Sequence, residues 1–154
     1  MKRDSRLSGV LHALLHMGQV EGPMTSDQLA ACLHTNPVVV RRTMAGLREA
    51  GLVLSEKGHG GGWRLGRPLS GITLRDVHTA LGEPALTPES PSTESPGCLV
   101  EAAVNRSLEA AYAEARALIE ARLAHITLAD LAADFADRMA DFKPGVPHGP
   151  DHAA

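Results

Sequence analysis

The side chains of this sequence with the clearest capacity for chemistry are two cysteines, Cys32 and Cys98. Cys98 follows Pro96-Gly97 at the expected start of a helix, where backbone amides stabilise a thiolate. This position suits a redox-reactive thiol, and the competing interpretation, which we weigh slightly higher because free cysteines are mostly buried and inert, is a small apolar side chain packed at the helix start. Cys32 lies among packing residues and is expected in the core. A Cys32–Cys98 bridge between two chains also stays open.

A histidine pair and a glycine-rich loop suggest two further kinds of chemistry. His12 and His16 are four residues apart and share one helix face, a spacing that a metal ion can use. We favour the simpler interpretation of a polar helix face. The loop His59-Gly60-Gly61-Gly62-Trp63 resembles the oxyanion-hole loop of esterases. The chain lacks the G-x-S-x-G nucleophile elbow which that fold requires, and 154 residues are too few for its large sheet.

This loop belongs to a continuous run, residues 36–68, that predicts a helix followed by a hairpin. Asn36 is a good N-cap, Pro37 a good first helical residue, and Gly51 suits the left-handed position after the helix. An apolar face with arginines away from it suits a helix laid in a DNA groove. The spacing places Val40, Met44 and Leu47 on that face, and Val39, Arg41 and Arg42 off it.

Residues 52–56 and 63–65 predict the two strands of the hairpin, with four glycines in the tip between them. Lys57 and His59 flank this tip, where a wing would meet phosphates or the minor groove. Trp63 is expected to pack where the wing joins the domain. Arg64 and Arg67 either contact phosphates or solubilise the strand.

Two helices are expected before this run. Residues 5–18 carry an amphipathic stripe, and Thr25 and Gln28 are spaced as the capping box of a second helix. The short turn His34-Thr35-Asn36 joins the second helix to the third, which predicts a helix-turn-helix. After the hairpin, Thr73 is expected to cap a further short helix.

The second half of the chain predicts a linker and two more helices. Residues 83–97 are rich in proline and hydroxyl side chains and are expected to form a linker loop. A long helix is predicted from about residue 98 to 124 and a last helix from 127 to 142, followed by a disordered tail. Apolar side chains at intervals of four and three predict a seam that pairs two chains: Val104, Leu108, Ala111, Ala115 and Leu118.

Formal charge is unevenly distributed along the chain. The whole sequence carries −3, yet residues 36–68 hold six basic and two acidic residues, and residues 69–154 hold six basic and thirteen acidic ones. A basic segment suits DNA contact, and an acidic end suits another task. We expect no enzyme, because no nucleophile–base set or phosphate loop is present. The absence of a signal segment or membrane span predicts a cytosolic protein, in which two cysteines do not indicate a disulfide framework.

The hairpin residues carry a family resemblance. The pattern GLV-x-S-x-x-G-x-GGG-x-x-L-x-R-P over residues 51–68, followed by Ile72-Thr73-Leu74 and Val77, resembles the Rrf-two (Rrf2) family of bacterial repressors. NPVVVRR at residues 36–42 and ITLADL at 126–131 resemble the YwnA-like branch of that family.

The resemblance implies a homodimeric winged-helix transcription regulator whose third helix enters the major groove while the wing reaches the minor groove. By position it places groove contacts at Val39, Arg41 and Arg42, and a basic wing residue at Lys57. Thr25, Ser26, Thr35 and Asn36 lie at helix starts, where they could donate hydrogen bonds to phosphates. His59 and Arg64 join the set because they lie on the wing. The predicted DNA-binding set is Thr25, Ser26, Thr35, Asn36, Val39, Arg41, Arg42, Lys57, His59 and Arg64.

The sequence departs from cluster-binding members of the family. Those members carry three cysteines after the wing domain, whereas residues 83–100 contain only Cys98. We therefore expect no cofactor, with an iron–sulfur cluster as the alternative. Such a cluster would be shared across a dimer and would use Cys98 with His12 or His16 of the partner.

These observations predict a mainly α protein with a small β-hairpin wing. The expected parts are a winged helix-turn-helix domain (1–82), a linker loop (83–97), dimerisation helices (98–142) and a disordered tail (143–154). The expected function is a homodimeric repressor that binds double-stranded DNA at an inverted-repeat operator, without a membrane, and that responds to thiol oxidation through Cys98. The alternatives are an iron–sulfur or metal-sensing regulator on the same scaffold and a winged-helix protein-interaction module.

Overall fold

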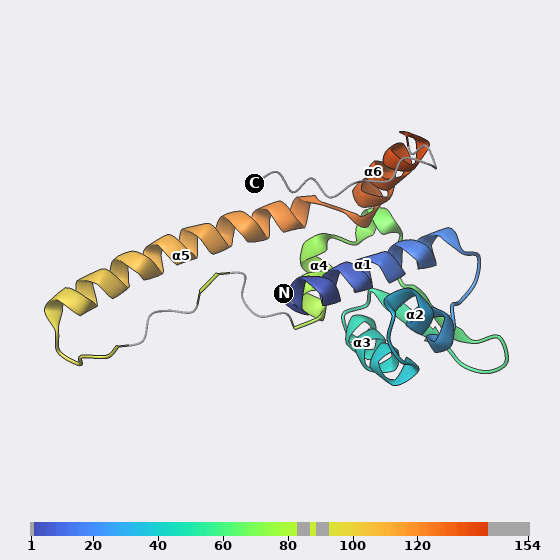
Figure 1. The fold of residues 1–154 in the computed structure, drawn as a ribbon, viewed down its shortest axis with the longest axis horizontal. Coiled ribbons are helices and arrows are strands. Elements are labelled where there is room, and N and C mark those ends of the chain that lie inside the picture. The colour runs from blue at the N-terminus through green and yellow to red at the C-terminus, as the bar shows by residue number, and fades with distance from the viewer. Residues whose placement is uncertain (1, 83–86, 89–92, 142–154) are drawn as a thin grey trace, which may run out of the picture.

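A computed structural model describes residues 2–82, 87–88 and 93–141 of the chain (Figure 1). The predicted tail from residue 143 and part of the predicted linker lie outside these residues. The elements follow in the order α1 (Lys2–Gln19), α2 (Ser26–Leu33), α3 (Pro37–Glu49), β1 (Val53–Glu56), β2 (Gly62–Leu65), a 3-10 turn (Leu69–Gly71), α4 (Leu74–Ala80), α5 (Leu99–His125) and α6 (Leu128–Asp141).

The first three helices form the core that the apolar spacing predicts. Helix α3 buries Val40, Met44 and Leu47 completely, and α2 contributes Leu29. Leu14 of α1 is also fully buried in this cluster. The amphipathic patterns of the three helices are therefore confirmed.

A tight turn joins α2 to α3. His34 ends α2 in the left-handed conformation, with φ of 50°, and its N–H bonds back to the carbonyls of the last turn. Asn36 then caps α3, because its side-chain oxygen accepts from the N–H groups of Val38 and Val39 at 3.0 and 3.1 Å. The prediction of a helix-turn-helix at this position is confirmed.

The two strands form an antiparallel hairpin in which Val53 pairs with Leu65 and Glu56 with Gly62. Trp63 attaches this wing to the start of α2. Its backbone exchanges two hydrogen bonds of 2.8 Å with Met24, and its indole N–H donates to the hydroxyl of Ser26 at 3.1 Å. Trp63 is only 9% exposed, so it is a packing residue, as predicted.

Glycine is required at two kinds of position in the wing. Gly58 and Gly60 have φ of 97° and 77°, in the left-handed region that favours glycine. Gly61 and Gly62 are required for a different reason, since a Cβ would collide with the carbonyl oxygen of Glu56 in the first case and of Met24 in the second.

The last helix returns to the winged-helix core. Leu128, its first residue, is fully buried within the same cluster as the side chains of α1 to α4. Backbone bonds of 2.9 Å run from the N–H of Leu74 to Ile126 and from the N–H of Leu128 to Ile72. The starts of α4 and α6 are thus tied together, a contact that the sequence reasoning did not anticipate.

Both of these helix starts have threonine caps. Thr73 and Asp76 form a capping box at α4, and Thr127 accepts from the N–H of Asp130 at α6 while that carboxylate accepts from Thr127. Hydrogen bonds from the backbone and the hydroxyl of Thr127 lower the pKa of the Asp130 carboxyl below its usual value.

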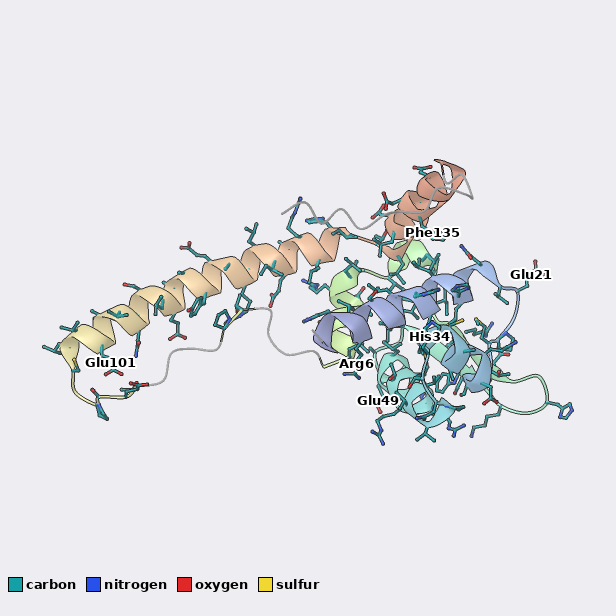
Figure 2. All side chains as sticks on the ribbon, in the orientation of Figure 1. Arg6, Glu21, His34, Glu49, Glu101 and Phe135 are labelled. Atoms are coloured by element: carbon teal, nitrogen blue, oxygen red, sulfur yellow. The ribbon has the colours of Figure 1, made fainter. Side chains whose placement is uncertain are left out.

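Helix α5 stands apart from this core (Figure 1). It has 27 residues, none of them buried, and it packs against α4 at its C-terminal part. Figure 2 shows side chains projecting from α5 on several sides, with Glu101 at the end farthest from the core. In the part of the chain that the structure describes, no helix is long and apolar enough to cross a membrane.

Candidate nucleic-acid interface

Helix α3 presents a polar face opposite its buried one. Because Val40 and Leu47 are fully buried, helical geometry places Val38 and Arg42 on the opposite side, with Arg41 beside them. Both arginines are exposed. Neither arginine side chain forms a hydrogen bond or ion pair with another described residue. Their guanidinium groups are therefore available to an external partner.

The predicted phosphate contacts gather at the starts of α2 and α3. Asn36 and Thr35 are exposed at the turn before α3. Thr25 accepts from the N–H of Gln28 at 3.2 Å, which leaves its own hydroxyl hydrogen free to donate. Ser26 differs from the others, because its hydroxyl already accepts from the indole of Trp63. Ser26 is thus in part a structural residue of the wing joint.

The basic residues of the wing fall into two groups. One group is exposed at the tip, and the other is engaged in contacts within the chain. Lys57 and His59 are exposed at the tip. Arg64 instead forms an ion pair of 2.7 Å with Glu56 on the neighbouring strand. Arg67 donates to the carbonyl of Ala50 at 3.1 Å and so caps the C-terminal end of α3.

The structure also exposes apolar side chains beside these residues. Val38 on α3 is 57% exposed, Val39 43% and Leu54 on the wing 43%. Val39 belongs to the predicted set, whereas Val38 and Leu54 were missed. The signal for Val38 was its place on the face opposite Val40 and Leu47. An alternating strand pattern, with Leu54 next to buried Val53, gave the signal for Leu54.

Cys98 lies at the start of α5, as predicted. It is exposed and is the N-cap, with its sulfur accepting from the N–H of Glu101 at 3.5 Å. The Glu101 carboxylate accepts from the N–H groups of Glu94 and Ser95 at 2.6 and 2.8 Å, which folds the preceding turn against the helix. Cys32 is partly buried and packs against the core, as expected.

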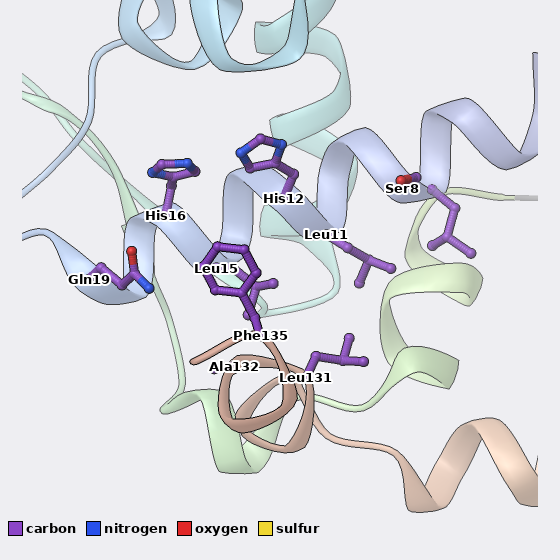
Figure 3. A pocket seen from close by; sticks show the side chains of 10 residues that line it. Ser8, Leu11, His12, Leu15, His16, Gln19, Leu131, Ala132 and Phe135 are labelled. Atoms are coloured by element: carbon purple, nitrogen blue, oxygen red, sulfur yellow. The ribbon is translucent and has the colours of Figure 1, made fainter. Parts of the chain in front are cut away.

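His12 and His16 lie beside an apolar groove between α1 and α6 (Figure 3). Their rings stack with centroids 4.7 Å apart. Figure 3 shows both rings on the side of α1 away from Leu131, while Leu11, Leu15 and Phe135 converge within the groove. Both histidines are among the residues that line this groove, and the choice between a polar helix face and a metal pair stays a prediction.

The residues present do not fit an iron–sulfur cluster held within one chain. Such clusters are held mainly by cysteine thiolates, four in the common types. The sequence has two cysteines, one on α2 and one at the start of α5. Among residues 2–82, 87–88 and 93–141, no group of three or more histidine, cysteine or acidic side chains is placed to hold a metal ion.

Comparison with known proteins identifies a family of regulators. The Rrf2 family model, described as an iron-dependent transcriptional regulator, matches residues 3–134. Two proteins of Bacillus subtilis (strain 168) named as HTH-type transcriptional regulators are similar in sequence. YwnA is 27% identical over 83% of this chain and 95% of its own length. YwgB is 34% identical over 53% of this chain, and the match spans about half of YwgB, also 53%.

Two solved structures resemble the whole arrangement. CymR, the global cysteine regulator of Bacillus subtilis, is 27% identical, with a TM-score of 0.61 over 84% of this chain and 92% of CymR. IscR of T. potens is 27% identical, with a TM-score of 0.55 over 90% of this chain and 88% of IscR. The predicted winged-helix fold is confirmed by these similarities.

Proposed function

Because the Rrf2 family model spans residues 3–134, the chain belongs to this family of transcriptional regulators, and we propose that it is a homodimeric, sequence-specific DNA-binding repressor. The outer face of α3 is the observation that carries the proposal. It presents Arg41 and Arg42 without partners among the described residues, between a capped helix start and a glycine-rich wing.

Each part of this surface has a distinct task in the proposal. Helix α3 enters the major groove, where Arg42 at the centre of its outer face donates to the O6 and N7 atoms of guanine. Asn36, Thr35 and Thr25 lie at helix starts and contact phosphates, with Lys57 of the wing adding charge. Affinity then depends strongly on salt, because these contacts release counterions from the DNA.

Exposed apolar side chains on α5 support the homodimer. Val104 is 50% exposed, Leu108 38% and Leu118 66%, and Ala111 and Ala115 are exposed beside them. An apolar seam on a helix with no buried residue is typical of a surface that a second copy covers. A two-fold dimer presents two equal winged-helix domains, each called a head below, so the operator is an inverted repeat.

The test replaces Arg42 by alanine. The proposed dimer then loses one bidentate base contact in each half-site, which weakens specific operator binding by about thirtyfold or more, while non-specific binding changes little. The measurement is a fluorescence-anisotropy titration with the DNA upstream of the chain's own gene and with a scrambled duplex.

Arg106→Ala is the matched control, because Arg106 is an exposed arginine on α5, far from the head. It should bind the operator like the unmodified protein. Unchanged operator affinity in Arg42→Ala, with an unchanged melting temperature, would contradict the proposed role of α3.

The finer proposal is that oxidation of Cys98 controls binding. Its sulfur is exposed at the start of the helix that pairs the two copies. In the presence of diamide, two Cys98 thiols, one from each copy, would form a disulfide, and diamide would accept their two electrons and two protons. We expect diamide to weaken operator binding of the unmodified protein and to leave Cys98→Ser unaffected. Equal sensitivity of both proteins would refute this role, and Cys32→Ser serves as the control.

A further inference from the structure

We propose that the cleft between α4 and α5 is an effector site for a small aliphatic carboxylate. This cleft has a volume of about 300 Å³ and lies where the long helix meets the winged-helix core. Side chains from both helices line it, chiefly Arg75 and His78 of α4 and Arg116, Ile119, Glu120 and Leu123 of α5.

Arg116 is held in place for a ligand by a hydrogen bond from outside the cleft. Its Nε–H donates to the hydroxyl of Thr87 at 3.2 Å, and Thr87 is only 7% exposed. This bond fixes the plane of the guanidinium. The four N–H donors of its two terminal nitrogens remain, in the fork geometry that matches a carboxylate.

Arg75 stands at a position that the local helix disfavours. It is the second residue of α4, where the N-terminal end of the helix dipole repels a positive charge. Its side chain forms no hydrogen bond or ion pair with another residue that the structure describes. A local cost without a compensating contact is typical of a functional position.

The chemistry of the lining selects the class of ligand. Two arginines and a histidine face one acidic side chain, Glu120, so an anion balances the charge of the cleft. Ile119 and Leu123 supply an apolar wall, which suits a short aliphatic chain and gives an inorganic anion nothing to contact. The volume lies at the lower end of the range for ligand pockets, so the ligand is small.

The cleft is placed to influence DNA binding. The cleft lies at residues 116–123, in the C-terminal half of α5, whereas Val104 and Leu108 of the exposed seam lie in its N-terminal half, so a ligand and a second copy can contact different lengths of the helix. Since α5 packs against α4, a ligand between them biases the angle between the long helix and the head. In a dimer this angle sets the spacing of the two recognition helices. This consequence rests on the proposed function, whereas binding itself does not.

Direct binding to the full chain without DNA tests the site, with valerate as the probe and valeramide as its uncharged match. We expect saturable chemical-shift changes for valerate and none for valeramide. Arg116→Gln and Arg75→Gln should each weaken valerate binding about tenfold or more, because each removes a charge-assisted contact. Arg106→Gln, on the same helix but outside the cleft, should bind valerate normally.

The proposal fails at this stage if valerate does not saturate, if both cleft variants bind it normally, or if sulfate binds equally well. Using two cleft variants guards against a folding defect in either one, and the dispersion of each spectrum reports the fold.

Operator titration with saturating valerate tests the regulatory role. Valerate should change operator affinity by about fivefold or more, and operator DNA should change valerate affinity by the same factor, because binding free energies are reciprocally coupled. Arg116→Gln should show no such coupling. Saturable valerate binding with unchanged operator affinity would overturn the effector role. A protein that binds valerate but no DNA at all would instead refute the proposed function and leave the site intact.

Discussion

Lys57 and Arg64 lie on the same hairpin, yet their surroundings predict different contributions to DNA binding. Arg64 is paired with Glu56 at 2.7 Å, so a phosphate must compete with an existing partner. Lys57 is exposed beside the glycine tip. We expect Lys57→Ala to weaken non-specific and specific binding equally and to reduce the salt slope by about two, because the proposed dimer loses one phosphate contact in each copy.

Arg64→Ala should leave the salt slope nearly unchanged, because an arginine that stays paired with Glu56 neutralises no phosphate. Anisotropy titrations of both variants between low and moderate salt provide the measurement. A larger loss of slope for Arg64→Ala than for Lys57→Ala would show that the ion pair opens on binding.

For these residues, the sequence predicts the charge of the segment but not which basic side chains have partners within the chain. Net positive charge over residues 36–68 correctly identified a basic segment, and charge follows from composition alone. Which arginine is free depends on partners across the hairpin and at the end of α3, as for Arg64 with Glu56 and Arg67 with Ala50. Those partners are set by strand register and loop path, which the residue types do not specify.

At the scale of elements, the wing depends on close backbone approach at Gly62. A Cβ there would collide with the carbonyl oxygen of Met24. This oxygen accepts one of the two backbone hydrogen bonds that hold the wing next to the start of α2. We expect Gly62→Ala to lower the free energy of unfolding by about 1–3 kcal/mol, as overpacking against rigid backbone does.

Thermal unfolding followed by circular dichroism measures this change. Gly71→Ala is the matched control, because a Cβ there meets only ordinary contacts of 3.7 to 3.8 Å. A melting temperature for Gly62→Ala equal to that of Gly71→Ala would show that the wing shifts without cost.

Helices were the most predictable elements, since each carries its own period and cap. The Asn36 cap, the buried Val40 and Met44, and the Thr73 cap are all local signals, and all are confirmed. Contacts between distant elements were not predictable in the same way. Leu128 in the core and the joint between Ser26 and Trp63 arise from tertiary packing, which a single sequence does not encode by spacing.

At the scale of the whole molecule, the exposed seam of α5 predicts a dimer. Acidic side chains introduced into this seam should separate the two copies. We expect Val104→Glu combined with Leu108→Glu to yield a monomer, because two-fold symmetry brings like charges together in an apolar interface. Light scattering coupled to size exclusion should then give a mass near 16.2 kDa instead of twice that value.

Arg106→Glu is the control, since Arg106 is an exposed residue of α5 away from the seam. It should remain a dimer. Retention of the dimeric mass by the seam variant would assign dimerisation to another surface, such as the groove between α1 and α6.

Burial of Leu128 in the winged-helix core also fixes an order of events during protein synthesis. The ribosome makes the whole of α5 before it reaches this residue, so the core of the head cannot be completed while α5 is still missing. A nascent chain therefore exposes its proposed pairing helix before its reading head is finished. Under the proposed function, a newly made winged-helix domain completes its core only when the helix proposed to join its partner is already present, which would limit the time in which a single domain occupies half of the proposed operator.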